Sequence, residues 1–137
     1  MVSGQWLEIR GPIVAKEKVR SYRDLIAWQK AVELVTDLYR VSKKFPSEEL
    51  FGLTSQLRRA AISVPSNIAE GQGRLGRKEF QHFLGNARGS LWEVETQIII
   101  ARNLDYLSEA EMNDILEISA EVGRILNGLL SSLKTQN

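Results

Sequence analysis

The sequence predicts an all-α protein, an antiparallel up-down-up-down four-helix bundle with left-handed crossings that forms a homo-oligomer. Four long segments carry apolar residues at three- and four-residue spacing, nothing convincing alternates with a period of two, and the links between the segments are short. The chain has 137 residues, 43% of them hydrophobic, which is enough for one core. We therefore expect residues 21–137 to form one bundle domain, and residues 1–20 to be an N-terminal extension that is weakly structured or docked on the bundle.

The first helical segment carries two apolar stripes and ends at Phe45-Pro46, because proline cannot continue a helix. One stripe consists of Leu25, Trp28, Val32, Val35 and Tyr39. The stripe beside it consists of Ala31, Leu34, Leu38, Val41 and Phe45. A single bundle core needs only one stripe, so part of this surface is expected to face a partner subunit.

End signals place the three segments that follow. Ser47, with two glutamates after it, is a candidate N-cap of the second helix. The third helix is expected to begin near Arg77 and to stop near Asn103. Ser108 and Glu111 fit a capping box, in which each side chain accepts a hydrogen bond from the backbone of the other, and they predict the start of the fourth helix.

The stretch SVPSNIAEGQGRLGR, residues 63–77, interrupts the pattern between the second and third helices. Pro65 has no N–H to donate, so it predicts a bend in the helix or a restart of it. Asn67 and Glu70 would project near the helix end, and Gly71 with the two glycines after it permits backbone conformations that other residues avoid. The stretch is either a kinked helix end with a solvated loop, or a mobile basic loop that meets phosphates beside a helix N-terminus.

Two arginines in the second helix, Arg58 and Arg59, are adjacent and so point about 100° apart. We expect at least one of them to pair with Glu93 or Glu95 of the third helix, as a device that fixes the register of the two helices. The other arginine would be free on the surface.

Gly85 and Gly89 lie one turn apart in the third helix, where each costs about 1 kcal/mol relative to alanine. Small residues at this spacing predict the close approach of another helix backbone. Arg88 would then lie at the rim of that contact, where it is available to a ligand or to an acidic neighbour.

The net charge of +1 hides an uneven distribution. Residues 10–44 hold nine Lys and Arg against four Asp and Glu, residues 50–92 hold six against two, and residues 93–137 hold three against eight. The split predicts a basic surface from the first three helices that could hold RNA or DNA through its phosphates. Alternatively, the two charge sets neutralise one another within or between subunits. The candidate nucleic-acid-binding residues are Arg58, Arg59, Arg74, Arg77, Lys78 and Arg88.

Composition leaves little support for catalysis. The chain has no cysteine and a single histidine, His82, so disulfides, thiolate metal sites and Ser-His-Asp arrangements are poorly supported. The letters from Gly71 to Gly76 match G-x-G-x-x-G, but they follow a helix where a dinucleotide site requires a strand. No run resembles a signal peptide or a transmembrane span. We expect a soluble, cytoplasmic, non-enzymatic protein with no metal, no cofactor and no membrane contact.

Three segments together resemble the four-helix-bundle family of 23S rRNA intervening-sequence proteins, which are encoded by open reading frames inserted in bacterial 23S rRNA genes. The segments are YRDLIAWQKAVEL (22–34), FGLTSQLRRAAISVPSNIAEGQGR (51–74) and FLGNARGSLWEVETQI (83–98). The resemblance implies a four-helix bundle assembled as a ring-like homopentamer, without enzymatic activity. It also implies kinship with the accessory variability protein of diversity-generating retroelements, which works with a reverse transcriptase and nucleic acid.

Two hypotheses about function follow. The first is a nucleic-acid-binding accessory protein that acts on RNA or DNA through phosphates, together with a nucleic-acid enzyme such as a reverse transcriptase. The second is a protein–protein interaction scaffold whose basic surface meets acidic helices, either its own in the oligomer or those of a partner. Salt dependence separates them, because phosphate binding weakens log-linearly as salt rises.

Overall fold

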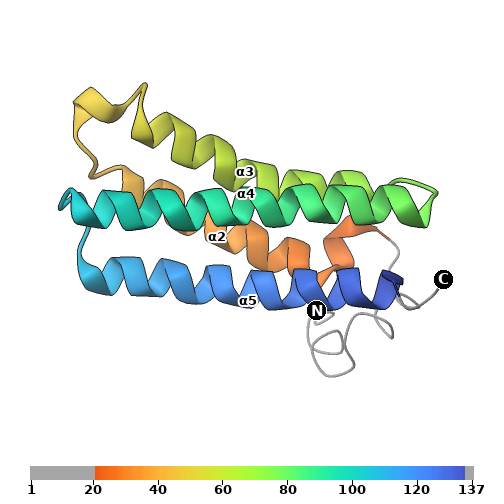
Figure 1. The fold of residues 1–137 in the computed structure, drawn as a ribbon. Coiled ribbons are helices and arrows are strands. Elements are labelled where there is room, and N and C mark those ends of the chain that lie inside the picture. The colour runs from red at the N-terminus through yellow and green to blue at the C-terminus, as the bar shows by residue number, and fades with distance from the viewer. Residues whose placement is uncertain (1–20, 135–137) are drawn as a thin grey trace.

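The computed structural model describes residues 21–134 and shows an all-α fold of four packed helices (Figure 1). The helices are α2 (Ile26–Ser42), α3 (Leu53–Gln72), α4 (Arg77–Asn103) and α5 (Glu109–Lys134). Two 3-10 turns, η1 (Tyr22–Asp24) and η2 (Ser47–Glu49), precede α2 and α3. The predicted all-α four-helix fold is confirmed, and the ring-like homo-oligomer stays a prediction. The extension expected at residues 1–20 lies outside the described residues.

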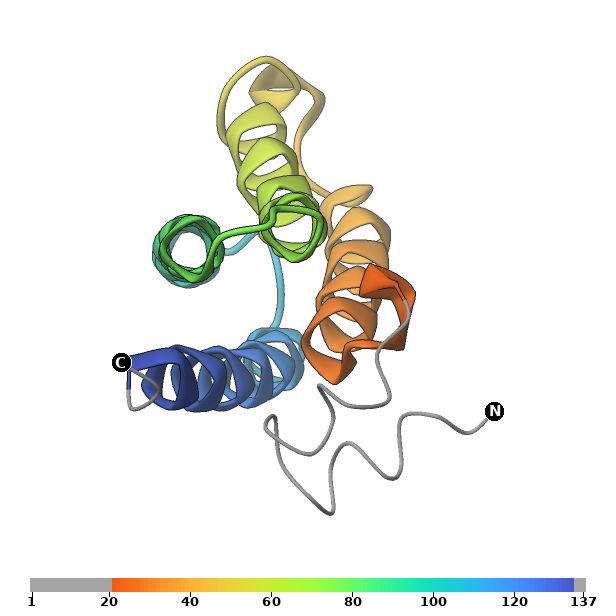
Figure 2. The same ribbon diagram turned by 90° about the vertical axis from the view of Figure 1, so that its right-hand side faces the viewer.

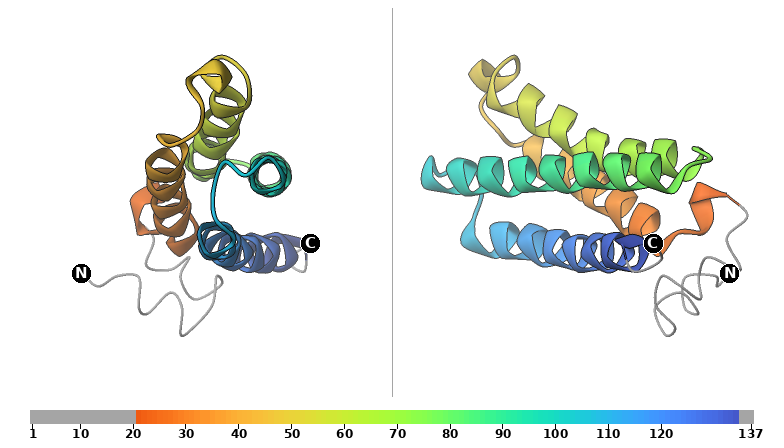
Figure 3. Two further views of the ribbon diagram at one scale, coloured as in Figure 1. Left: turned by 90° about the vertical axis from the view of Figure 1, so that its left-hand side faces the viewer. Right: turned by 45° about the vertical axis from the view of Figure 1, so that its right-hand side comes forward.

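Successive helices run antiparallel, and each packs against two neighbours in the cyclic order α2, α3, α4, α5 (Figures 1 and 2). Helices that face each other diagonally make no backbone contact within residues 21–134. The view from the opposite end shows the same ring of four helices (Figure 3). Such an arrangement encloses one core, as expected for a bundle.

The core is built from the apolar stripe that each helix turns inward. Its largest fully buried side chains are Leu34, Leu38, Leu57, Ile68, Leu84, Leu91, Ile98 and Leu126. Removing this much apolar surface from water is the main stabilising contribution to the fold. The inward stripes of all four predicted segments are confirmed.

The second helix begins later than its sequence suggests. Pro46 is extended (ψ 143°), residues 47–49 form a 3-10 turn, and α3 starts only at Leu53. The N-cap expected at Ser47 is therefore wrong for α3. Glu49 does the capping instead, because its Oε1 accepts a hydrogen bond from the Leu53 backbone N–H at 3.1 Å.

The capping box predicted at the start of α5 is confirmed. The Ser108 backbone N–H donates to Glu111 Oε1 at 2.9 Å, and the Glu111 N–H donates to Ser108 Oγ at 3.1 Å. These reciprocal bonds satisfy two donors that the first turn of a helix leaves without partners.

Helix α3 continues through Pro65 without a restart. Its first half is inclined away from α4 and its second half runs beside α4, so the helix changes direction along its length (Figures 1 and 3). Pro65 is buried within this helix. Helices α3 and α4 therefore diverge toward the start of α3 and lie side by side toward its end.

The glycines after Glu70 do not take the unusual backbone conformations expected of them. Gly71 lies inside α3, and Gly73 caps the helix with φ −79°. Gly71 is required for a steric reason: a Cβ there would lie 2.9 Å from side-chain atoms of both Phe80 and Phe83 of α4. The missing side chain lets the end of α3 approach the start of α4 closely.

Candidate functional site

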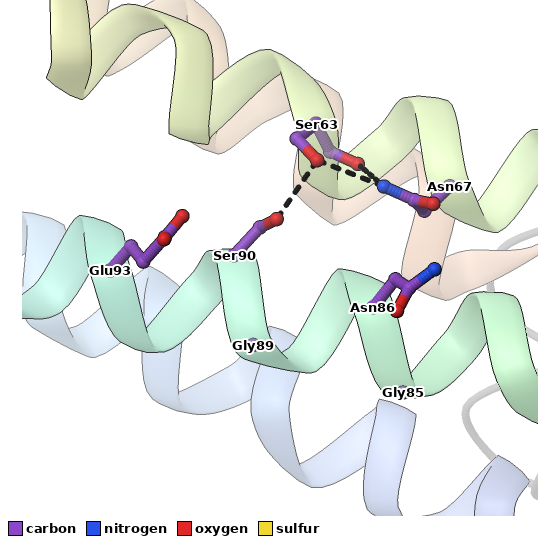
Figure 4. Close-up of a pocket in the computed structure, with 7 residues that line it drawn as sticks. All are labelled: Ser63, Asn67, Gly85, Asn86, Gly89, Ser90 and Glu93. Carbon is purple, nitrogen blue, oxygen red and sulfur yellow. Dashed lines mark hydrogen bonds between the residues drawn. The ribbon is translucent and has the colours of Figure 1, made fainter.

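A polar groove runs along the outside of the α3–α4 packing. It is lined by Ser63, Asn67, Gly85, Asn86, Gly89, Ser90 and Glu93 (Figure 4). We call it the α3–α4 groove. Ser90 Oγ donates to Ser63 Oγ at 2.8 Å, and Asn67 Nδ2 donates to the Ser63 carbonyl oxygen at 2.8 Å. The structure thus brings together Asn67, Gly85, Gly89 and Glu93, four residues that the sequence singled out for separate reasons.

The two groove glycines face open space. A Cβ built at Gly85 or at Gly89 meets nothing within 4 Å. The close helix approach expected at these glycines is therefore not made by any helix within residues 21–134. What the two positions provide is a shallow backbone surface on the outside of α4.

Three large apolar side chains continue this surface along α4. Trp92 is 56% exposed, Ile99 45% and Ile100 43%. Trp92 and Ile99 lie seven residues apart, which is about two helical turns, and Ile100 follows directly, so all three lie on the side of α4 opposite its core stripe. We call Gly85, Gly89, Trp92, Thr96, Ile99 and Ile100 the outer α4 face; none of these six side chains is charged.

Surplus apolar surface was expected on the first helix, and here the structure differs. Trp28 and Val35 are partly buried and pack against the core, and only Val32 of that stripe is exposed, at 36%. The stripe is covered because η1 and α3 pack against α2. A second apolar stripe in α4, with Trp92 and Ile99 seven residues apart, was the signal that sequence reasoning missed.

The predicted basic residues do not gather on one surface. Arg58 Nε donates to Ser42 Oγ of α2 at 2.9 Å, whereas Arg88 Nη1 donates to Asn127 Oδ1 of α5 at 2.9 Å. Arg59 is exposed on α3. These three arginines thus lie along the bundle, each beside a different neighbour.

The other three candidates lie together at the link between α3 and α4. Arg74 Nη2 pairs with Glu70 Oε2 at 2.5 Å, and its guanidinium lies 5.0 Å from the centre of the Phe83 ring. Arg77 and Lys78 are exposed in the first turn of α4. The positive end of the helix dipole adds to their charge, so this end of the bundle is locally basic.

The ion pair expected between Arg58 or Arg59 and a glutamate of the third helix is absent from residues 21–134. Glu95 Oε2 instead accepts a hydrogen bond from Ser119 Oγ at 2.5 Å, and so joins α4 to α5. Glu93 is exposed in the α3–α4 groove. The expectation fails because Arg58 points toward α2, a choice that depends on tertiary packing.

Part of the uneven charge is neutralised inside the chain, between α2 and α5. Lys44 Nζ pairs with Glu111, and Lys30 Nζ lies 3.6 Å from Glu121 Oε2. The hydrogen bond from Lys44, together with that from the Ser108 N–H, lowers the pKa of the Glu111 carboxyl below its usual value. Acidic residues of α5 thus neutralise part of the positive charge in and after α2.

Within residues 21–134 no cluster of three or more His, Cys, Asp or Glu residues is placed to hold a metal ion. None of the helices in that range is long and apolar enough to cross a membrane.

The fold and its outer surfaces define a class of protein, an all-α four-helix bundle with exposed apolar side chains on the outside of one helix, where the Arg88 guanidinium lies 5.2 Å from the centre of the Trp92 ring. The chain belongs to the family described as 23S rRNA-intervening sequence protein, whose pattern matches residues 23–128. The resemblance inferred from its three segments is thereby confirmed. No curated protein matches the chain. Membership in this family assigns no specific activity.

Proposed function

We propose that this chain is a non-enzymatic scaffold that assembles with further copies of itself through the outer α4 face. One observation carries the proposal: Trp92, Ile99 and Ile100 are exposed together beside two glycines that meet nothing within 4 Å. Contiguous apolar surface of this kind is typical of protein interfaces. Burying a Trp or an Ile side chain contributes about 1.5–3 kcal/mol, so a few such residues can hold an interface together.

The composition of the face favours a helix as the partner. Gly85 and Gly89 let a neighbouring backbone approach closely, and Trp92 and Ile99 supply apolar contact one to three turns further along. If this face contacts a different surface of the next copy, each copy is rotated relative to the one before it. The copies form a closed ring when these rotations add up to a full turn. The resemblance to the family favours a ring of five.

The experiment compares two doubly substituted proteins by size-exclusion chromatography with light scattering. One carries Trp92→Glu and Ile99→Glu on the outer α4 face. The matched control carries Ile62→Glu and Leu75→Glu, which add the same charge at exposed apolar positions elsewhere. We expect the control to keep the mass of the unmodified protein and the face variant to fall to the 15.5 kDa of one chain. A face variant with unchanged mass would contradict the proposal.

A second function, binding of RNA or DNA through phosphates, is favoured by a separate observation. Arg77 and Lys78 are exposed at the N-terminus of a 27-residue helix, with Arg74 beside them. Such a basic end suits phosphate contact without base recognition. Action alongside a nucleic-acid enzyme such as a reverse transcriptase belongs to this second proposal.

A further inference from the structure

A pocket of about 310 Å³ lies between the end of α2 and the start of α3. This size is at the lower end of the range for small-molecule sites. It is lined by Ser42, Lys43, Phe45, Pro46, Ser47, Leu50, Thr54 and Arg58. The pocket shares no residue with the α3–α4 groove or with the outer α4 face.

Two cations line the pocket, the half-buried Arg58 and the exposed Lys43, and Arg58 is held in place by two contacts. Its Nε donates to Ser42 Oγ, and its guanidinium carbon lies 4.5 Å from the centre of the Tyr39 ring. Among residues 21–134 no carboxylate lies within ion-pair distance of it, and its two terminal nitrogens have no protein acceptor. A half-buried guanidinium without a counter-ion presents a fork of N–H donors that fits two coplanar oxygens.

A hydroxyl in the wall supplies a further donor. Thr54 lines the pocket and is 3% exposed as a whole residue, and no hydrogen bond from its hydroxyl is made within residues 21–134. The hydroxyl oxygen is not enclosed by the protein, so it can reach a group bound in the pocket. An oxygen atom bound in the pocket would accept the hydrogen bond that Thr54 can donate.

The remaining walls are apolar. Phe45 is buried, Pro46 is half-buried, and Leu50 is exposed at the mouth. These walls favour a ligand whose anionic group carries an apolar body, because inorganic phosphate would leave the apolar surface without a partner. We propose that this pocket binds a carboxylate attached to an apolar body, which is either a small organic acid or the C-terminal carboxylate of a peptide.

The test titrates the full chain with sodium benzoate and follows backbone amide resonances by NMR. We expect saturable shifts at the pocket residues with a dissociation constant of about 1 mM. Benzamide, which is neutral and of similar shape, should bind at least about tenfold more weakly, because it loses the charge-assisted hydrogen bonds. Acetyl-Ala-Phe and its C-terminal amide form the peptide arm. Tighter binding of acetyl-Ala-Phe than of benzoate supports a chain end as the ligand, and the reverse order supports a small acid.

Substitutions tie the binding to the pocket. Arg58→Gln should weaken benzoate binding at least about tenfold, whereas Arg59→Gln, at the exposed neighbouring position, should leave it within about twofold. Thr54→Val keeps the side-chain shape but removes the hydroxyl, so it should weaken benzoate binding about threefold or more. This variant still tests the proposal if Arg58→Gln does not fold. Equal binding of benzoate and benzamide, unchanged binding in Arg58→Gln or in Thr54→Val, or tighter binding of inorganic phosphate than of benzoate would overturn the proposal.

Discussion

Ser90 of α4 donates a hydrogen bond to Ser63 of α3, with 2.8 Å between the two hydroxyl oxygens. Asn67 of α3 donates to the same Ser63 hydroxyl at 2.9 Å, so three polar side chains join the two helices. The neighbouring core contacts are hydrophobic and therefore non-directional, whereas these hydrogen bonds require a particular geometry. They therefore help to fix how α3 sits against α4.

Ser90→Ala should lower the free energy of unfolding by about 1 kcal/mol, because the Ser63 hydroxyl loses its partner on the neighbouring helix. Chemical denaturation followed by circular dichroism measures the loss. Ser131→Ala, at an exposed position of α5, is the control and should stay within about 0.5 kcal/mol of the unmodified protein. Equal effects of the two substitutions would show that the Ser63–Ser90 bond adds nothing to stability.

Two glycine-to-alanine substitutions should act in opposite directions. Gly71→Ala places a methyl group 2.9 Å from Phe80 and Phe83, so it should lower the melting temperature. Gly85→Ala meets nothing within 4 Å and improves helix propensity by about 1 kcal/mol, so it should raise the stability of the single chain. Thermal unfolding of both variants at low protein concentration measures the two melting temperatures. A shift of both melting temperatures in the same direction would contradict the prediction.

The ion pair between Lys44 and Glu111 should make stability depend on pH. The pKa of Glu111 is lower in the fold than in the unfolded chain, so its contribution is present above the unfolded pKa and disappears as pH falls through the folded pKa. Glu111→Gln should therefore cost more stability at about pH 7 than at about pH 2.5. Chemical denaturation at the two pH values measures the loss in the free energy of unfolding. Glu117→Gln, at an exposed position of α5, is the control. A cost independent of pH would contradict this account of the pair.

The basic end at the α3–α4 link gives a test of the nucleic-acid hypothesis. Replacing Arg74, Arg77 and Lys78 together by alanine should weaken binding to RNA or DNA of any sequence and should reduce the salt slope by up to about three charges. Fluorescence anisotropy at about 50 mM salt, where electrostatic affinity is high, measures this. The absence of any binding by the unmodified protein under those conditions would remove this second function.

Much of the fold can be predicted from local signals. The bounds of α4 follow from the residues at its two ends, and the start of α5 follows from the Ser108–Glu111 capping box. The start of α3 could not be predicted in this way, because Glu49 caps it from an earlier turn. Local sequence defines which residues can cap a helix, but the path of the chain decides which of them does so.

The candidate surfaces were less predictable than the fold. The role of Arg58 depends on Ser42 and Tyr39, which lie on a different helix and sixteen or more residues earlier in the chain. The apolar surplus of the first helix is covered by packing that periodicity alone does not reveal. The outer α4 face, in contrast, can be recognised from the sequence, because Trp92 and Ile99 are seven residues apart and form a second apolar stripe on that helix.

Sedimentation equilibrium of the unmodified protein over micromolar concentrations tests whether copies of this chain join through the outer α4 face. We expect a mass of two or more chains of 15.5 kDa each, with five chains favoured by the family resemblance. A mass of 15.5 kDa at every concentration would contradict it.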